Sequence, residues 1–283
     1  MMIKNWQKII NLFFKNVSTT LILLFLGSIA DSPAIFANPN NFRNNSLKFT
    51  PPPPPPDRGA AGDRGGGASR GCGSAKQALM ALAPDYQQTI NLARGETIPV
   101  TKVWGLTTAQ YPTFWFFVPY DKSSITTMEF VIKDESQKPS KTLYRTFLNK
   151  PEIPGIIGIP MSANIQPLEI SNKMHQKMYH WFLKVKVKCD PQQPAKLETV
   201  EGWIERISPS PTLANELKQG TPLQQAELYA KNGIWYNALT TLAQLRLAKP
   251  KDASLLANWT TLLQSEELGD LADRPLNYKL LQP

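Results

Sequence analysis

Near the middle of this 283-residue chain the sequence reads Thr113-Phe114-Trp115-Phe116-Phe117-Val118, and Pro119 follows. An unbroken run of apolar side chains leaves neither face of a strand for solvent, which is typical of a strand buried on both sides. Proline has no N–H group to donate to a neighbouring strand, so we expect the strand to end at Pro119. The segment therefore predicts a central strand of a β-sheet.

Strand patterns recur at short intervals on both sides of this segment. Residues 126–133 alternate, with Met128, Phe130 and Ile132 on one side. The other candidates are residues 142–148, 156–159, 179–189 and 199–207, with weaker ones at 103–107 and 79–82. Short strands without intervening helices favour an antiparallel β-sandwich, which we expect over residues 71–208.

The candidate strand at 179–189 has an apolar face and a basic face. Trp181, Leu183, Val185, Val187 and Cys189 share the first, and His180, Phe182, Lys184, Lys186 and Lys188 share the second. Lysines on an open face are solvated and discourage pairing with other sheets. Binding of acidic glycans or lipid headgroups by Phe182, Lys184, Lys186 and Lys188 is the alternative. We expect His180 at the surface or rim of the sheet.

The last part of the chain, residues 209–283, changes to a helical period. The predicted helices span residues 224–232, 235–248 and 253–264. Tyr229, Gly233, Ala238, Leu242, Leu245 and Pro250 have the spacing of the second half of a tetratricopeptide repeat. One such unit is too little for a free-standing solenoid, so we expect a small helical region with a repeat-like hairpin packed on the sandwich. A peptide-binding repeat fragment is the alternative.

The first 37 residues have the three parts of a secretory signal peptide. Lys4, Lys8 and Lys15 make a basic start, an apolar run covers residues 19–30, and Pro33 and the cleavage site Ile35-Phe36-Ala37 follow. The apolar run is about 12 residues long, shorter than the roughly 20 that a membrane-spanning helix needs. We expect cleavage after Ala37 and a secreted or periplasmic chain without a transmembrane span; an uncleaved anchor is the alternative.

Residues 38–70 hold few large apolar side chains and include uninterrupted prolines from Pro51 to Pro56, followed by a Gly-rich stretch. This composition buries too little apolar surface to offset the chain entropy lost on ordering, so we expect a disordered linker. Arg58, Arg64 and Arg70 recur every six residues. A docking strip for an anionic partner is therefore the alternative interpretation.

The chain has two cysteines, Cys72 at the start of the expected sandwich and Cys189 on the apolar side of its strand. Two cysteines in an exported protein are more often paired than free. We therefore predict a Cys72–Cys189 disulfide that ties the end of the linker to the sheet.

Two Cys and two His are too few for a four-thiolate cluster or a three-histidine metal centre. The different spacings of Glu198, Glu201 and Glu205 split them between the two faces of one strand, and a solvated face explains them, so we do not expect the carboxylate pair of a hydrolase there. The sequence predicts no catalytic, metal-binding or cofactor-binding residue.

Several motifs in the same order resemble a known family. They are residues 112–120, Tyr179-His180-Trp181-Phe182 running to Cys189-Asp190, Val200-Glu201-Gly202-Trp203-Ile204, residues 229–239, and the Arg-Gly-Cys at 70–72. From Arg70 to Pro275 the chain is similar to the cyanobacterial family catalogued as domain of unknown function 928. The resemblance implies an envelope or secreted protein of cyanobacteria. No catalytic residues come with the family, so it implies none here.

We expect a non-catalytic binding protein of the cell envelope, with the sandwich as platform and the helical region for protein contacts. Its partner would be an envelope protein or an anionic envelope surface, and export argues against nucleic acid. A polyanion or carbohydrate binder through Lys184, Lys186 and Lys188 is the alternative, and a hydrolase is a third possibility. Any exposed tryptophan would be a contact anchor. The candidates are Trp104, Trp115, Trp181, Trp203, Trp235 and Trp259.

Overall fold

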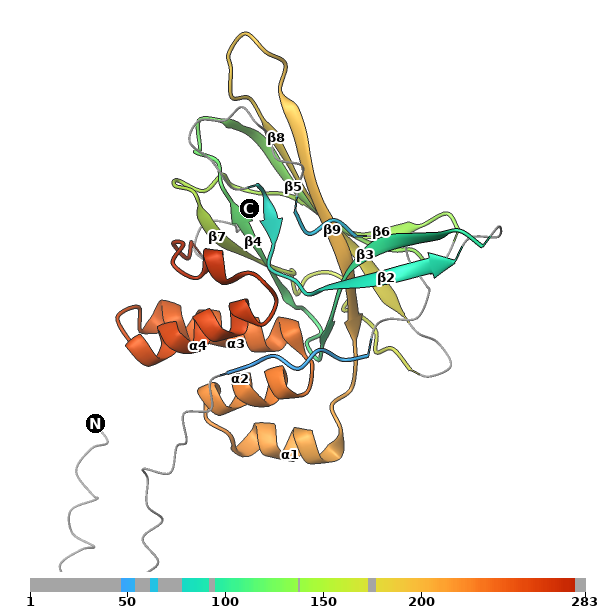
Figure 1. The fold of residues 1–283 in the computed structure, drawn as a ribbon, viewed down its shortest axis with the longest axis vertical. Coiled ribbons are helices and arrows are strands. Elements are labelled where there is room, and N and C mark those ends of the chain that lie inside the picture. The colour runs from blue at the N-terminus through green and yellow to red at the C-terminus, as the bar shows by residue number, and fades with distance from the viewer. Residues whose placement is uncertain are drawn as a thin grey trace, which may run out of the picture. The chain divides into compact units, whose positions relative to one another are not determined.

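The computed structural model describes residues 47–53, 62–65, 78–91, 95–136, 138–172 and 177–277. Its strands are β1 (Met80–Ala81), β2 (Asp85–Asn91), β3 (Thr97–Thr107), β4 (Thr113–Val118), β5 (Ile125–Asp134), β6 (Lys141–Phe147), β7 (Gly155–Pro160), β8 (Met178–Val187) and β9 (Lys196–Arg206). The helices are α1 (Pro211–Gln219), α2 (Pro222–Lys231), α3 (Trp235–Ala248), α4 (Ala253–Gln264) and the 3-10 helix η2 (Gly269–Leu271). The predicted α+β architecture, a mostly antiparallel β body followed by helices, is confirmed (Figure 1).

The strands form two sheets. One has the order β1-β4-β7, and the other has the order β2-β3-β9-β8-β5-β6. Neighbouring strands are antiparallel except β3 and β9, which run parallel from the pair Trp104–Trp203 to the pair Thr107–Arg206. The long chain between these two strands lets them run in the same direction.

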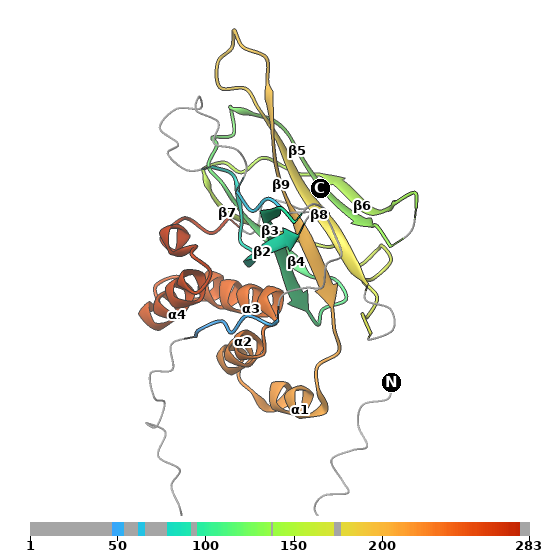
Figure 2. The same cartoon turned by 45° about the vertical axis from the view of Figure 1, so that its right-hand side comes forward.

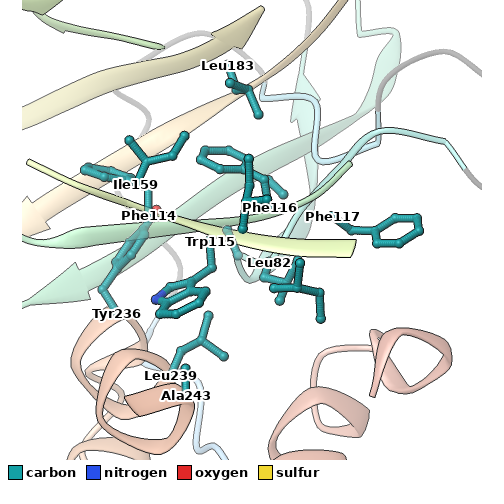
Figure 3. Packing of buried hydrophobic residues seen from close by; sticks show 14 of the residues in the cluster. Leu82, Phe114, Trp115, Phe116, Phe117, Ile159, Leu183, Tyr236, Leu239 and Ala243 are labelled. Carbon is teal, nitrogen blue, oxygen red and sulfur yellow. The ribbon is translucent and has the colours of Figure 1, made fainter. Parts of the chain in front are cut away.

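Strand β4 is buried on both faces because its sheet is a middle layer. It has the predicted bounds, and every residue in it is buried. The ring of Phe116 lies 6.0 Å from that of Phe130 in β5 and 5.5 Å from that of Trp181 in β8. Trp115 points the other way, and its Nε1 donates to Oγ1 of Thr240 in α3 at 3.0 Å. The three-stranded sheet therefore lies between the six-stranded sheet and the helices (Figure 3).

Helix α3 attaches the helical region to the sheets. Trp235 Nε1 donates to the backbone oxygen of Leu82 at 2.8 Å, a buried hydrogen bond. Asn237 Oδ1 accepts from Thr107 Oγ1 and from the backbone N–H of Thr108, both at 2.9 Å. These partners are far apart in sequence, so the bonds form only when the helices pack on the sheets. The helical region therefore packs on the β body, as we expected from the sequence.

Local signals set where the helices begin. Ser210 caps α1, and Thr221 caps α2 in a capping box with Gln224. Helix α1 has no counterpart among the helices predicted from the apolar period, because Leu213 alone among its residues is buried. Its cap and the proline at its start were the available signals.

Two parts of the predicted linker lie against the β body and the helices, contrary to the expectation for 38–70. In one of them, Asp63 and Glu201 of β9 exchange backbone hydrogen bonds of 3.1 and 2.9 Å. The backbone N–H of Ala81 in β1 donates to the oxygen of Arg64 at 2.7 Å. Residues 62–65 thus join both sheets through backbone groups, which composition does not reveal. The rest of 38–70 and the predicted signal peptide lie outside the described residues.

Candidate functional site

The second ordered part of the predicted linker, residues 47–53, lies along the helical region (Figures 1 and 2). Leu47 and Phe49 are each only 2% exposed. The ring of Phe49 meets that of Trp235 edge-on at 4.9 Å. The backbone N–H of Thr50 donates to the oxygen of Ala230 at 3.1 Å. Apolar side chains and backbone groups both hold this segment, which is how proteins hold a bound peptide.

Gly233, at the turn between α2 and α3, makes this close approach possible. Its φ of +73° lies in the left-handed region that favours glycine. A Cβ atom here would lie 3.0 Å from Cδ of Pro52 and 3.2 Å from the backbone oxygen of Thr50. The glycine of the repeat-like motif therefore makes room for segment 47–53.

A pocket of about 580 Å³ opens beside the start of this segment. Its walls are Leu47 and Lys48 together with Glu216, Gln219, Gly220, Gln224, Glu227, Leu228 and Lys231 of the α1–α2 region. Burial raises the pKa of the Glu227 carboxyl. We call this the α1–α2 pocket. Its amides and its charges of both signs suit the backbone and side chains of a polypeptide. Sequence reasoning missed these residues, because α1 was not expected and the wall forms only when segment 47–53 docks.

The predicted basic face of β8 is present, but it carries mixed charge. Phe182 is half-buried, with Nζ of Lys133 5.0 Å and Nζ of Lys184 5.7 Å from its ring centre. Glu129 lies opposite Lys184 on β5, and Glu201 lies opposite Phe182 on β9.

The outer end of the same face is more open. Lys186 is exposed, and so is Lys188, which follows the end of β8. Leu197, opposite Lys186, and Phe147, on β6, are each 63% exposed. This end is therefore both basic and apolar.

The expectation that His180 lies at the surface or rim is wrong, since it is only 5% exposed. Its ring stacks between Phe182 and Trp203, with centroid separations of 4.0 and 4.2 Å. Nδ1 is 3.0 Å from Glu135 Oε1, and Nε2 is 3.4 Å from Glu201 Oε2. Burial lowers the pKa of His180, although both carboxylates oppose this effect. A second apolar cluster, of Trp104, Met178 and Trp203, covers this face of the sheet, and strand alternation cannot predict it.

The other predicted contact residues divide into two groups. Arg58, Arg70 and Cys72 lie outside the described residues. Cys189 is half-buried against the main core. Because Cys72 is not described, the Cys72–Cys189 disulfide stays a prediction. All six tryptophans proposed as possible anchors are buried.

The side chain of Arg64 contacts other residues of the same molecule. Its Nη1 lies 3.3 Å from Asp85 Oδ1 and donates to the backbone oxygen of Glu266 at 2.8 Å. The arginine therefore fastens residues 62–65 to β2 and to the turn after α4.

Glu266 is buried beside this contact, and burial raises its pKa from an ordinary value of 4.5 to about 7, although Arg64 opposes the shift. A raised folded-state pKa gives stability that is present below pH ~4.5 and is lost as the pH rises through ~7. We expect Glu266→Gln to match the native chain near pH 5 and to be about 1–2 kcal/mol more stable at pH 8, after allowance for solvent screening.

Urea unfolding at both pH values tests this prediction. The control is Glu96→Gln, which removes an exposed carboxylate just before β3. A difference between Glu266→Gln and the native chain that does not change with pH would contradict it.

In the described part of the chain, no three His, Cys, Asp or Glu side chains gather in a way that could hold a metal ion. None of the helices in this part is long and apolar enough to cross a membrane.

Comparison with known proteins agrees with the motifs of the sequence. The sequence model of the family described as Domain of Unknown Function (DUF928) matches residues 65–276, which span both sheets and the helices. Among curated proteins, no match is found. Because the match covers well over half of the sequence, the chain belongs to the Domain of Unknown Function 928 family.

Proposed function

We propose that this protein is a non-catalytic binding protein of the cell envelope, and that its helical region binds an extended polypeptide in the α1–α2 pocket. One observation carries the proposal: the helical region already holds segment 47–53 in extended form, and the pocket continues from Leu47 and Lys48. A partner polypeptide in the pocket would lie next to segment 47–53 and bind the same helices in a similar way.

The pocket's chemistry supports a polypeptide as the ligand. Glu216 and Glu227 offer carboxylates to a cationic side chain, and Lys48 and Lys231 offer ammonium groups to an acidic one. Gln219 and Gln224 can both donate to and accept from a peptide backbone. Leu47 and Leu228 supply the apolar contact.

We also propose that the chain is exported from the cytoplasm. Residues 1–37 would direct export and be removed after Ala37. Outside the cytoplasm Cys72 and Cys189 would be able to pair. Recovery of the chain from the cytoplasm with residues 1–37 intact would contradict this part.

Site-specific photo-crosslinking tests the binding surface. A photoreactive residue at Gln219, in the α1–α2 pocket, should crosslink an envelope polypeptide. The same residue at Lys141, at the exposed start of β6, is the control and should give only background. Equal crosslinking from both positions, or none from Gln219, would refute the proposal.

The exposed lysines and apolar side chains at the outer end of β8 favour a second candidate, a polyanion or carbohydrate binder. A photoreactive residue at Lys186 separates the two functions. If the basic face of β8 binds an anionic partner, crosslinks should form from position 186 and weaken with added salt, while crosslinks from position 219 stay at background.

A further inference from the structure

Strand β2 is one end of the six-stranded sheet. Both edges of the three-stranded sheet are covered: Ile156 of β7 bonds to Pro275 and Asn277, and Ala81 of β1 bonds to Arg64. The other end of the six-stranded sheet, β6, carries the charged residues Lys141 and Arg145. No described segment pairs with the outer side of β2. The β2 sequence, Asp-Tyr-Gln-Gln-Thr-Ile-Asn, contains no Lys or Pro, the residues that commonly protect an edge.

The backbone pattern shows which groups face outward. The N–H of Trp104 donates to the oxygen of Pro84, so this pair and every second pair after it bond β3 to β2. Gly62 donates to the oxygen of Thr101, on the opposite side of β3, in agreement with this alternation. The residues of β2 between the bonded pairs, including Gln87 and Thr89, therefore present their N–H and C=O groups at the open edge.

Only the start of this edge is occupied. The backbone N–H of Asp85 bonds to the Glu266 carboxylate. Gln87, Thr89 and Asn91 follow at the outward positions, and the side chains of Gln87 and Thr89 are exposed. The β2–β3 hairpin projects away from the helices (Figure 1). A two-stranded hairpin is marginally stable in water by itself, so an added strand would stabilise it.

We propose that two copies of this chain associate through this edge, with the two β2 strands antiparallel and Thr89 on the two-fold axis. Each Thr89 then bonds to its equivalent, and Gln87 of either copy bonds to Asn91 of the other, giving about six backbone hydrogen bonds. The segment from Gln87 to Asn91 has no charged side chain, so the symmetric pairing opposes no like charges. Thr–Thr pairs across strands are favourable. The occupant is a second copy because the segment complements itself.

A matched pair of proline variants tests this proposal by sedimentation velocity over a range of concentrations. Thr89→Pro removes an outward N–H from β2 and leaves the β2–β3 bonds in place. Thr97→Pro makes the same change on the other edge of the same hairpin, where Pro99 already stands. We expect the native chain and Thr97→Pro to dimerise alike, and Thr89→Pro to raise the dissociation constant about tenfold or more, because each dimer loses two hydrogen bonds.

A second pair guards against misfolding of the proline variant. Thr89→Lys keeps the backbone donor but places two ammonium groups together on the axis, so it should weaken the dimer, and added salt should restore it. Thr97→Lys is its control. Hydrogen exchange should show the amides of Gln87 and Thr89 protected only at dimer-forming concentrations. A native chain that is monomeric at every concentration, or a dimer unaffected by both Thr89 variants, would overturn the proposal. Neither result depends on the proposed function.

Discussion

Replacing Phe49 by alanine should lower the free energy of unfolding by about 3–5 kcal/mol, the usual cost of removing a buried aromatic ring. The ring is 2% exposed and lies edge-on against Trp235, which itself bonds to Leu82 of the β body. The cavity would open between segment 47–53 and α3. Urea unfolding followed by tryptophan fluorescence measures the loss.

Lys48→Ala is the matched control, because its side chain is exposed in the same segment. It should change the free energy of unfolding by less than about 0.5 kcal/mol. If Phe49→Ala were as stable as Lys48→Ala, segment 47–53 would contribute nothing to the stability of the fold. Its contact with the helices would then be no model for the binding of a partner polypeptide.

Gly202→Ala should be the other severe substitution, costing about 1–3 kcal/mol or more through overpacking. Gly202 lies opposite Trp181 in the β8–β9 pair. A Cβ atom there would be 2.5 Å from Cζ2 of Trp181 and 2.7 Å from Cγ1 of Val103, closer than carbon atoms can approach. Neither neighbour can move freely, because both belong to the buried core. We expect a lower thermal midpoint.

Gly65→Ala is the control for this substitution. Its Cβ atom would meet only Cε of Met80, at an ordinary 3.8 Å, so the thermal midpoint should hardly change. A Gly202→Ala chain that melts with the native protein would mean that the Trp181 ring does not cover this glycine in solution.

Strands were predicted best where a single physical cause, such as burial on both faces, produces the residue pattern. In β4 the continuous apolar run matched the observed strand at both ends, because burial on both faces leaves no polar position. Helices α3 and α4 also have the predicted bounds, since their apolar stripes face the core and Gly233 and Pro250 interrupt the period.

The incorrect and missing predictions also have physical reasons. Strand β2 was not expected, and β3 begins earlier than predicted, because their hairpin extends away from the core and so lacks the apolar pattern of a buried strand. His180 was placed at the surface because alternation assigns only one face of β8 to the main core. A second apolar cluster covers part of the opposite face.

Composition and periodicity are properties of neighbouring residues, so the sequence alone was enough to predict the α+β class and most of the strands and helices. The family was indicated by the resemblance of its motifs. Contacts between distant segments depend on how the layers pack. Only the tertiary structure could therefore show that residues 47–53 lie on the helices, that Arg64 is used internally, and that α1 and α2 enclose a pocket. The same reason applies to the open edge of β2, since an edge exists only once the order of strands in the sheet is known.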